Sequence, residues 1–170
     1  MSYRFRATIS NLNLFDTSKS RYIHVYFYDT LDDLKQGARA YLQRLSKKSQ
    51  VTVNDDELND EFFEGLRGLF QTQGFKSKLV RGQWVDSTPA MAGVIRYVLE
   101  GLNEEIILHE GLHAALHISR MANWELPDGD NSLQFTTEID DYEEGFCYLA
   151  SAIQRELLKL YYLPEIQGLK

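Results

Sequence analysis

Residues 104–121 constrain the fold of this chain more than any other stretch. Their apolar positions recur at helical spacing, Asn103 offers an N-cap, and no proline interrupts the pattern. The stretch also contains His109-Glu110-Gly111-Leu112-His113. Residues four apart lie one above the other on a helix, so both imidazoles project from one face with Glu110 beside them. We therefore expect a long helix that carries a polar group next to an apolar stripe.

Two histidines at this spacing, with a glutamate after the first, form the H-E-x-x-H arrangement of zinc peptidases. His109 and His113 would bind zinc as neutral imidazoles, and Glu110 would be the general base for the attacking water. Catalytic zinc sites usually have three protein ligands and one water. Because the chain has one cysteine and no suitable third histidine motif, we expect the third ligand to be a carboxylate.

The five-residue pattern alone is only suggestive, and a structural interpretation stands beside the catalytic one. On that interpretation, residues 104–121 form a buried amphipathic helix whose two histidines happen to have helical spacing and hydrogen-bond elsewhere. A downstream acidic segment favours the catalytic interpretation, because it could supply the missing ligand.

This acidic segment opens a second helical pattern over residues 142–160. Asp140, Asp141, Glu143 and Glu144 occupy its first turn. Carboxylates in a first turn complement the helix dipole whether or not a metal is nearby. The second helix must pack against the first to bury its stripe, so we expect at least one of the four acids to bind the metal.

With these residues, the chain resembles a small gluzincin, the group of zinc peptidases with H-E-x-x-H on one helix and a glutamate ligand on the next. Glu144-Gly145-Phe146 is similar to the E-G-F stretch of aminopeptidase-N type enzymes, and this resemblance selects Glu144 over Glu143 as the third ligand. Residues 109–117 resemble the H-E-x-x-H-A-x-x-H run of ImmA/IrrE-type regulator peptidases. The resemblance implies a compact regulatory peptidase of bacterial or phage origin. It leaves the N-terminal part of the chain unmatched.

Three residues are candidates for stabilising the developing oxyanion: Tyr142, Tyr148 and His117. The residues themselves leave this choice open, and Tyr148 is our prediction for the catalytic partner of Glu110. Thermolysin-like enzymes have an aspartate at the position of Tyr148, so the support of the metal-bound histidines must be built differently here. His117 continues the histidine face by one turn, where we expect it to be packed or hydrogen-bonded.

Composition limits the partners of the chain. A net charge of −7 and a pI near 5.1 argue against nucleic acid or an anionic membrane, since either would require a basic face. Cys147 is the only cysteine, the first residues lack the apolar core of a signal peptide, and no run reaches transmembrane length. We expect a cytoplasmic protein whose partner is a protein or peptide substrate.

The remaining pattern predicts one α+β domain over residues 1–170. Strands are expected at residues 3–9, 21–29, 76–85 and 93–99, and a helix at 31–46 begins with a capping box at Thr30 and Asp33. Residues 54–74 are expected to be a solvated helix face or a loop. This order predicts a small zincin-like fold, in which a mixed or antiparallel sheet backs the H-E-x-x-H helix and the glutamate-ligand helix.

We therefore predict a zinc-dependent peptidase that holds an extended peptide antiparallel along residues 93–99, just before the metal helix. An ordinary interior strand is equally compatible with these residues. Two rival functions remain. One is a zincin-fold regulatory or binding protein with a structural metal and no turnover, and the intact Glu110 counts against it. The other is a metal-free helical packing module.

Overall fold

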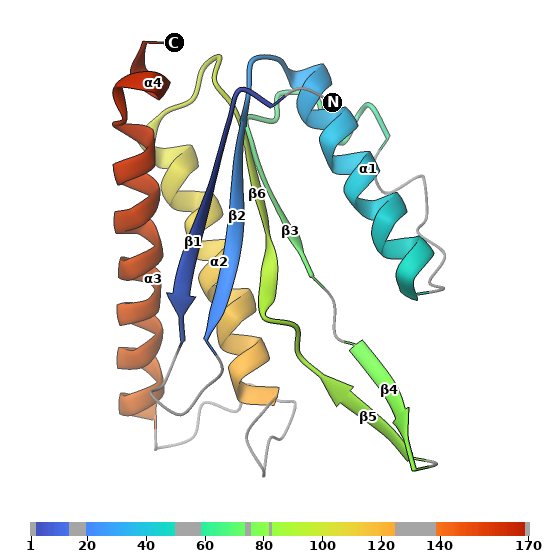
Figure 1. The fold of residues 1–170 in the computed structure, drawn as a ribbon. Coiled ribbons are helices and arrows are strands. Elements are labelled where there is room, and N and C mark those ends of the chain that lie inside the picture. Colours follow the sequence, from blue (N-terminus) through green and yellow to red (C-terminus); the bar gives the residue numbers. More distant parts are fainter. Residues whose placement is uncertain are drawn as a thin grey trace.

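The computed structural model describes residues 3–13, 20–49, 59–73, 76–81, 83–124 and 139–168. Four strands form a mixed sheet in the order β1-β2-β6-β3, and two more form a separate hairpin (Figure 1). The predicted α+β class is confirmed. The elements in chain order are β1 (Phe5–Leu12), β2 (Arg21–Tyr28), α1 (Leu31–Ser49), β3 (Gly68–Thr72), β4 (Lys76–Val80), β5 (Gln83–Ser87), β6 (Met91–Val98), α2 (Glu104–Trp124), α3 (Ile139–Tyr161) and α4 (Pro164–Gln167).

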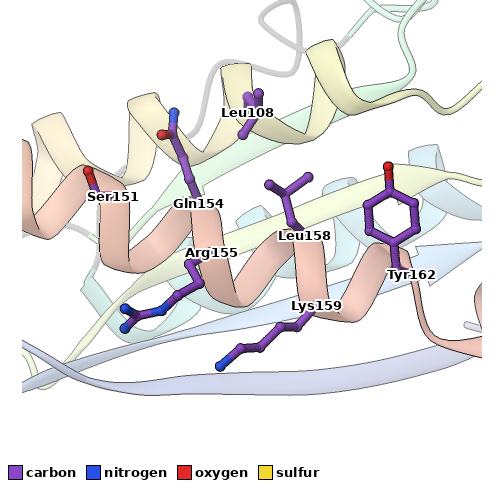
Figure 2. Close-up of a pocket in the computed structure, with 7 residues that line it drawn as sticks. All are labelled: Leu108, Ser151, Gln154, Arg155, Leu158, Lys159 and Tyr162. Carbon is purple, nitrogen blue, oxygen red and sulfur yellow. The ribbon is translucent and has the colours of Figure 1, made fainter.

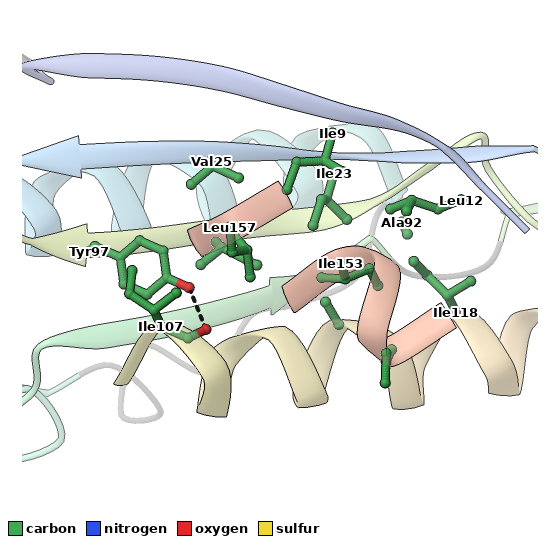
Figure 3. Close-up of a cluster of buried hydrophobic side chains, with 14 of the residues drawn as sticks. Ile9, Leu12, Ile23, Val25, Ala92, Tyr97, Ile107, Ile118, Ile153 and Leu157 are labelled. Atoms are coloured by element: carbon green, nitrogen blue, oxygen red, sulfur yellow. Dashed lines mark hydrogen bonds between the residues drawn. The ribbon is translucent and has the colours of Figure 1, made fainter. Parts of the chain in front are cut away.

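Helices cover both faces of the sheet, with α2 and α3 on one face and α1 on the other (Figure 1). The alternation of side chains along β2 explains this division. Ile23 and Val25 point into the main core with α2 and α3, whereas Tyr28 joins a smaller cluster with Leu34 of α1. In the main core, the hydroxyl of Tyr97 donates a hydrogen bond of 3.1 Å to the Ile107 carbonyl (Figure 3). This bond fixes the start of α2 against the middle of the sheet.

The prediction that residues 93–99 offer an edge strand to a substrate is wrong. β6 pairs in parallel with β2 on one side and antiparallel with β3 on the other, so it is an interior strand. Residues 92–99 are all buried, and a strand buried on both faces belongs inside a sheet. β3 is the edge strand on this side of the sheet.

The first strand pair and the helix starts agree with the sequence. β1 and β2 are antiparallel neighbours, the Asp33 N–H donates to Thr30 Oγ1 at 3.2 Å, and the Ile106 N–H donates to Asn103 Oδ1 at 3.0 Å. Both caps satisfy backbone donors that a helix start leaves without partners. None of the helices in the described ranges is long and apolar enough to cross a membrane.

Two strand predictions need correction. β3 lies inside residues 54–74, where a helix face or loop was expected, because a five-residue strand that starts with glycine gives almost no periodic signal. The single strand expected at residues 76–85 is instead the β4–β5 hairpin, in which Arg81 has a φ of 50° at the turn. A positive φ at a residue other than glycine is uncommon and leaves little trace in a sequence pattern.

Candidate metal and catalytic site

His109 and His113 project from one face of α2, one turn apart. Their Nε2 atoms are 3.0 Å apart, and the ring planes are nearly perpendicular, at 80°. Two imidazole nitrogens on one tetrahedral zinc ion lie about 3.3 Å apart, given the usual Zn–N distance. Both residues are exposed to solvent. The pair therefore converges on a point that one metal ion can occupy with small side-chain adjustments.

Glu110 points away from the solvent and toward β3. Its side chain is buried, with 7% of the residue exposed. Desolvation by burial raises the pKa of Glu110, while the nearby His109 and a backbone hydrogen bond from Phe70 act in the opposite direction. A carboxylate with a raised pKa is a better proton acceptor near neutral pH, which is what a general base requires.

Gly68 makes the close approach of α2 to β3 possible. A Cβ at this position would lie 2.8 Å from Glu110 Cγ and 2.9 Å from Ile106 Cγ2. Both distances are shorter than carbon atoms tolerate, so any larger residue would push the helix or Glu110 away from the strand. The absence of a side chain at Gly68 thus fixes the position of Glu110.

β3 is the edge strand beside this carboxylate. The Arg67 carbonyl accepts a hydrogen bond from the Val98 N–H, and the Gln73 N–H donates one to the Ala92 carbonyl. Val98 and Ala92 both belong to β6. In an antiparallel pair, such positions alternate with positions whose N–H and C=O groups point away from the partner. Gly68, Phe70 and Thr72 take these outward positions. Two of their groups already have partners, because the Phe70 N–H donates to Glu110 and the Thr72 carbonyl accepts from the Tyr41 hydroxyl at 3.3 Å.

His117 lies on the same side of α2, one turn beyond His113. Its ring packs edge-on against Phe70 with centroids 5.9 Å apart, and its Nε2 is buried without a hydrogen-bond partner among the described residues. Desolvation lowers the pKa of His117, although a hydrogen bond with the Gln73 backbone opposes this effect. A lowered pKa keeps the imidazole neutral at physiological pH.

Glu144 and Tyr148, the other predicted site residues, contact each other rather than the histidines. The Tyr148 hydroxyl donates a hydrogen bond of 3.3 Å to Glu144 Oε1, and Tyr148 is 69% exposed. The side chains of the alternative candidates lie outside the described residues: Asp140, Asp141, Tyr142 and Glu143. Within the described part of the chain, no three His, Cys, Asp or Glu side chains gather into a possible metal site.

The packing of α3 explains why Glu144 is separate from the histidine pair. A Cβ at Gly111 would lie 3.0 Å from Leu157 Cδ1, so this side of α2 faces α3. Gly111 is two residues from each histidine, which corresponds to roughly 200° around a helix of 3.6 residues per turn. The histidines therefore lie on nearly the opposite side of α2 from the part of α3 at Leu157.

The sequence pattern did not predict β3 or the close approach to α2 that Gly68 allows. The run Leu69-Phe70-Gln71-Thr72 contains aromatic and β-branched residues, which was the available signal for a strand. The acidic residues before it directed the interpretation toward a solvated segment instead.

An open groove between α2 and α3 contains none of the predicted site residues (Figure 2). It is lined by Leu108, Ser151, Gln154, Arg155, Leu158, Lys159 and Tyr162. These side chains are mainly aliphatic or positively charged and provide no acid or imidazole for metal binding.

No protein-family model, curated protein or solved structure matches the chain. The likeness to gluzincins therefore depends on the motif residues and on their geometry in α2.

Proposed function

We propose that the chain is a zinc-dependent peptidase. The observation that carries this proposal is the pair of Nε2 atoms on His109 and His113, 3.0 Å apart, next to the buried carboxylate of Glu110. Among the described residues, Glu110 forms no ion pair with lysine or arginine. Burying a carboxylate without such a partner lowers the stability of a fold, and a helix that only packs has no need of it. Catalysis by Glu110 explains the arrangement.

The residues fit a divalent zinc ion in part. His109 and His113 would hold it, and a carboxylate would complete the three protein ligands of a hydrolytic site. When bound, zinc would supply Lewis acidity for the attack of water on the peptide carbonyl. Glu110 would accept the proton of the attacking water and pass it to the leaving amine.

Tyr148 and His117 are the two candidates for the hydrogen-bond donor to the oxyanion. The Tyr148 hydroxyl is exposed and is turned toward Glu144. The His117 ring contacts Phe70, as Glu110 does, but a neutral imidazole has only one N–H, and His117 uses it in the hydrogen bond with the Gln73 backbone. We therefore keep Tyr148 as the proposed donor, and His117 is the alternative to be tested beside it.

The third ligand is the least defined part of the proposal. The resemblance favours Glu144, with Glu143 as the alternative and Asp140 or Asp141 in supporting roles. The described contacts give Glu144 a hydrogen bond with Tyr148 and none with the histidines. Binding of the metal by Glu144 would therefore require this bond to break.

The substrate is expected to be an extended protein segment that pairs with the outer edge of β3, where the Thr72 N–H and the Gly68 backbone groups point away from β6. The outward backbone groups of Gly68, Phe70 and Thr72 lie on the side of the sheet edge where Glu110 packs. Backbone pairing along an edge strand provides affinity with little dependence on side chains. The zincin-like arrangement and a cytoplasmic setting are parts of the same proposal.

The first test is metal content. Protein purified without chelator should contain one zinc per chain by elemental analysis, and His113→Ala should lose it. His24→Ala is the matched control, because His24 lies on β2 and should leave the zinc content unchanged. A wild-type chain that stays free of metal after zinc is supplied would contradict the proposal.

The second test separates an enzyme from a metal-binding protein without turnover. Glu110→Gln keeps the size of the side chain and an oxygen that can accept from Phe70. It should retain zinc and fold, and it should lower peptide hydrolysis by about a hundredfold or more, the usual scale for losing a general base. Zinc-loaded wild type without hydrolysis of any casein or peptide-library substrate would favour the structural-metal alternative.

The third test concerns the strand that receives the substrate. Thr72→Pro removes an outward N–H of β3 but leaves the bonds between β3 and β6 intact. We expect a higher KM with little change in kcat, whereas Thr72→Ala should behave as wild type. An unchanged KM for Thr72→Pro would place the substrate elsewhere.

A further inference from the structure

A second polar cluster lies on the opposite face of the sheet, beside α1. Side chains at alternate positions of β1 and β2 turn away from the main core there, and Arg6 lies across from Tyr26 while Thr8 lies across from His24. Arg6 and Thr8 are exposed, because α1 packs over β2 and β6. This face is therefore open to solvent at β1 and covered at β6.

Arginine and tyrosine side chains alternate across this face. The Tyr26 ring has the Cζ of Arg6 at 5.4 Å and the Cζ of Arg96 at 5.8 Å. The Tyr41 ring has Arg96 at 5.1 Å and Arg44 at 5.6 Å. Each ring thus interacts with two guanidinium groups, and the rings hold the cations in place through cation–π attraction.

These three arginines have no acidic partner among the described residues. Other arginines do have one: Arg39 pairs with Asp60 at 3.0 Å and Arg155 with Glu156 at 3.6 Å. The whole chain has a net charge of −7, whereas the charge of this group is positive. Such a group attracts anions even when the whole protein is acidic.

Arg96 gives independent support, because it is a buried cation whose hydrogen bonds are incomplete. It is 3% exposed, one Nη donates to the Gly37 carbonyl at 3.3 Å, and the guanidinium also forms a hydrogen bond with the Tyr28 hydroxyl. Its Nε and other Nη have no partner among the described residues, and burial lowers its pKa. A buried guanidinium without a counter-charge is costly, and an anion bound nearby would reduce that cost.

Two cations from different elements, Arg6 and Arg44, lie near His24. Arg6 donates to its Nε2 at 3.3 Å, so Nδ1 carries the proton and donates to Thr8 Oγ1 at 2.9 Å. Desolvation lowers the pKa of His24, and Arg6 of β1 and Arg44 of α1 lower it further. The imidazole is therefore neutral while two positive charges face it.

We propose that this face binds a phosphoryl group between Arg6 and Arg44, in an arginine–tyrosine site that comprises Arg6, His24, Tyr26, Tyr41, Arg44 and Arg96. The rings already interact with guanidinium groups, so they are not available for stacking nucleobases. The exposed N–H groups of Arg6 and Arg44 remain as donors, and the planar guanidinium matches the geometry of phosphate oxygens.

A phosphoryl group fits this site better than a single carboxylate does. It carries close to two negative charges at neutral pH and has three acceptor oxygens. These match the charges and donors of the exposed Arg6 and Arg44 and of the buried Arg96. The site lies on the sheet face opposite α2, so it is separate from the proposed zinc centre. The phosphoryl group can belong to a small molecule or to a phosphorylated peptide side chain.

The test is direct binding at low ionic strength, measured by calorimetry and by the NMR signals of His24, one of four histidines in the chain. The probes are inorganic phosphate, a nucleoside monophosphate, and a phosphoserine peptide with its unphosphorylated form. We expect saturable binding of at least one phosphorylated probe. Tightest binding of the nucleoside monophosphate would identify a small-molecule source, and tightest binding of the phosphopeptide a peptide source.

Matched variants test whether the arginine–tyrosine site binds the phosphorylated probe. Arg6→Ala and Arg44→Ala should each weaken binding by about tenfold or more, because each removes charge-assisted hydrogen bonds. Arg155→Ala, an exposed arginine on α3, should have no effect. His113→Ala should also leave binding unchanged, which excludes a phosphate held by zinc. The proposal is overturned if no phosphorylated probe binds, if acetate at equal ionic strength competes equally, or if Arg155→Ala weakens binding as much as Arg6→Ala.

Discussion

Helix α2 has two flanks of opposite character. The flank toward β3 carries His109, Glu110, His113 and His117, and the polar groups there are either exposed or packed against the strand. The flank toward α3 contains Gly111, where an added Cβ would lie 3.0 Å from Leu157 Cδ1. The two flanks belong to one helix and are separated by only one or two residues in sequence.

This difference follows from where the helix lies on the sheet. The β3 flank lies at a sheet edge, whereas the α3 flank contributes to the main core. On the proposed function, catalysis and stability would depend on different residues of one element. Substitutions on the two flanks should accordingly affect different measurements.

The largest expected effect concerns the α3 flank. Leu157→Ala removes a fully buried side chain and should lower the free energy of unfolding by about 2–5 kcal/mol, measured by urea denaturation. Zinc content and hydrolysis per folded molecule should stay the same. Lys159→Ala, at an exposed position of α3, is the control and should change stability by less than about 0.5 kcal/mol. A large loss of specific activity in Leu157→Ala would show that the two flanks are coupled.

The next effect tests whether α3 contributes to the polar flank at all. Glu144→Ala and Glu143→Ala should differ in zinc affinity, measured by competition with a chelator. Loss of a ligand should exceed the tenfold to roughly hundredfold loss that is usual for a supporting residue. The resemblance predicts that Glu144→Ala has the larger effect. If only Glu143→Ala empties the site, the ligand assignment is wrong, and equal small losses would place the third ligand on another residue.

The sequence predicted those parts of the fold that depend on neighbours along the chain. α2 was predictable from its apolar spacing and from the Asn103 cap, and the proximity of His109 and His113 follows from the geometry of one helical turn. The order of the strands was not predictable, because pairing joins residues that are distant in sequence. Nevertheless, the run of apolar residues in β6 was a sign of an interior strand.

The environment of Glu110 could not be predicted for the same reason. Its burial depends on Gly68, which precedes it by several elements, and on a strand that gave no periodic signal. The third ligand shows a different limit. The first turn of α3 offers four acids, and the residues alone did not choose among them. The resemblance selected Glu144, whose described contact is with Tyr148 and not with the histidines.

A smaller effect is expected from Gly68→Ala, on the β3 flank. The added methyl group would clash with Glu110 and Ile106, and overpacking of this kind costs about 1–3 kcal/mol of stability. If Glu110 is the general base, hydrolysis per folded molecule should also fall, because the clash displaces its carboxylate. Gly65→Ala is the control, since its positive φ of 73° also imposes a cost but its Cβ would meet no atom within 4 Å. Equal losses of activity in the two variants would remove the special role of Gly68.

The smallest effect is a pH dependence of stability in the metal-free protein. Burial raises the pKa of Glu110, so between its ordinary value and the raised value the folded state holds more protons than the unfolded state. Stability therefore falls as pH rises through that window, and the penalty is complete above the folded-state pKa. Glu110→Gln cannot ionise, so it should gain stability relative to wild type between pH 4 and pH 7 in chelator-treated samples. A stability difference between the two proteins that stays constant over this range would show that Glu110 titrates as it does in the unfolded chain, and that burial on the β3 flank does not desolvate its carboxyl group.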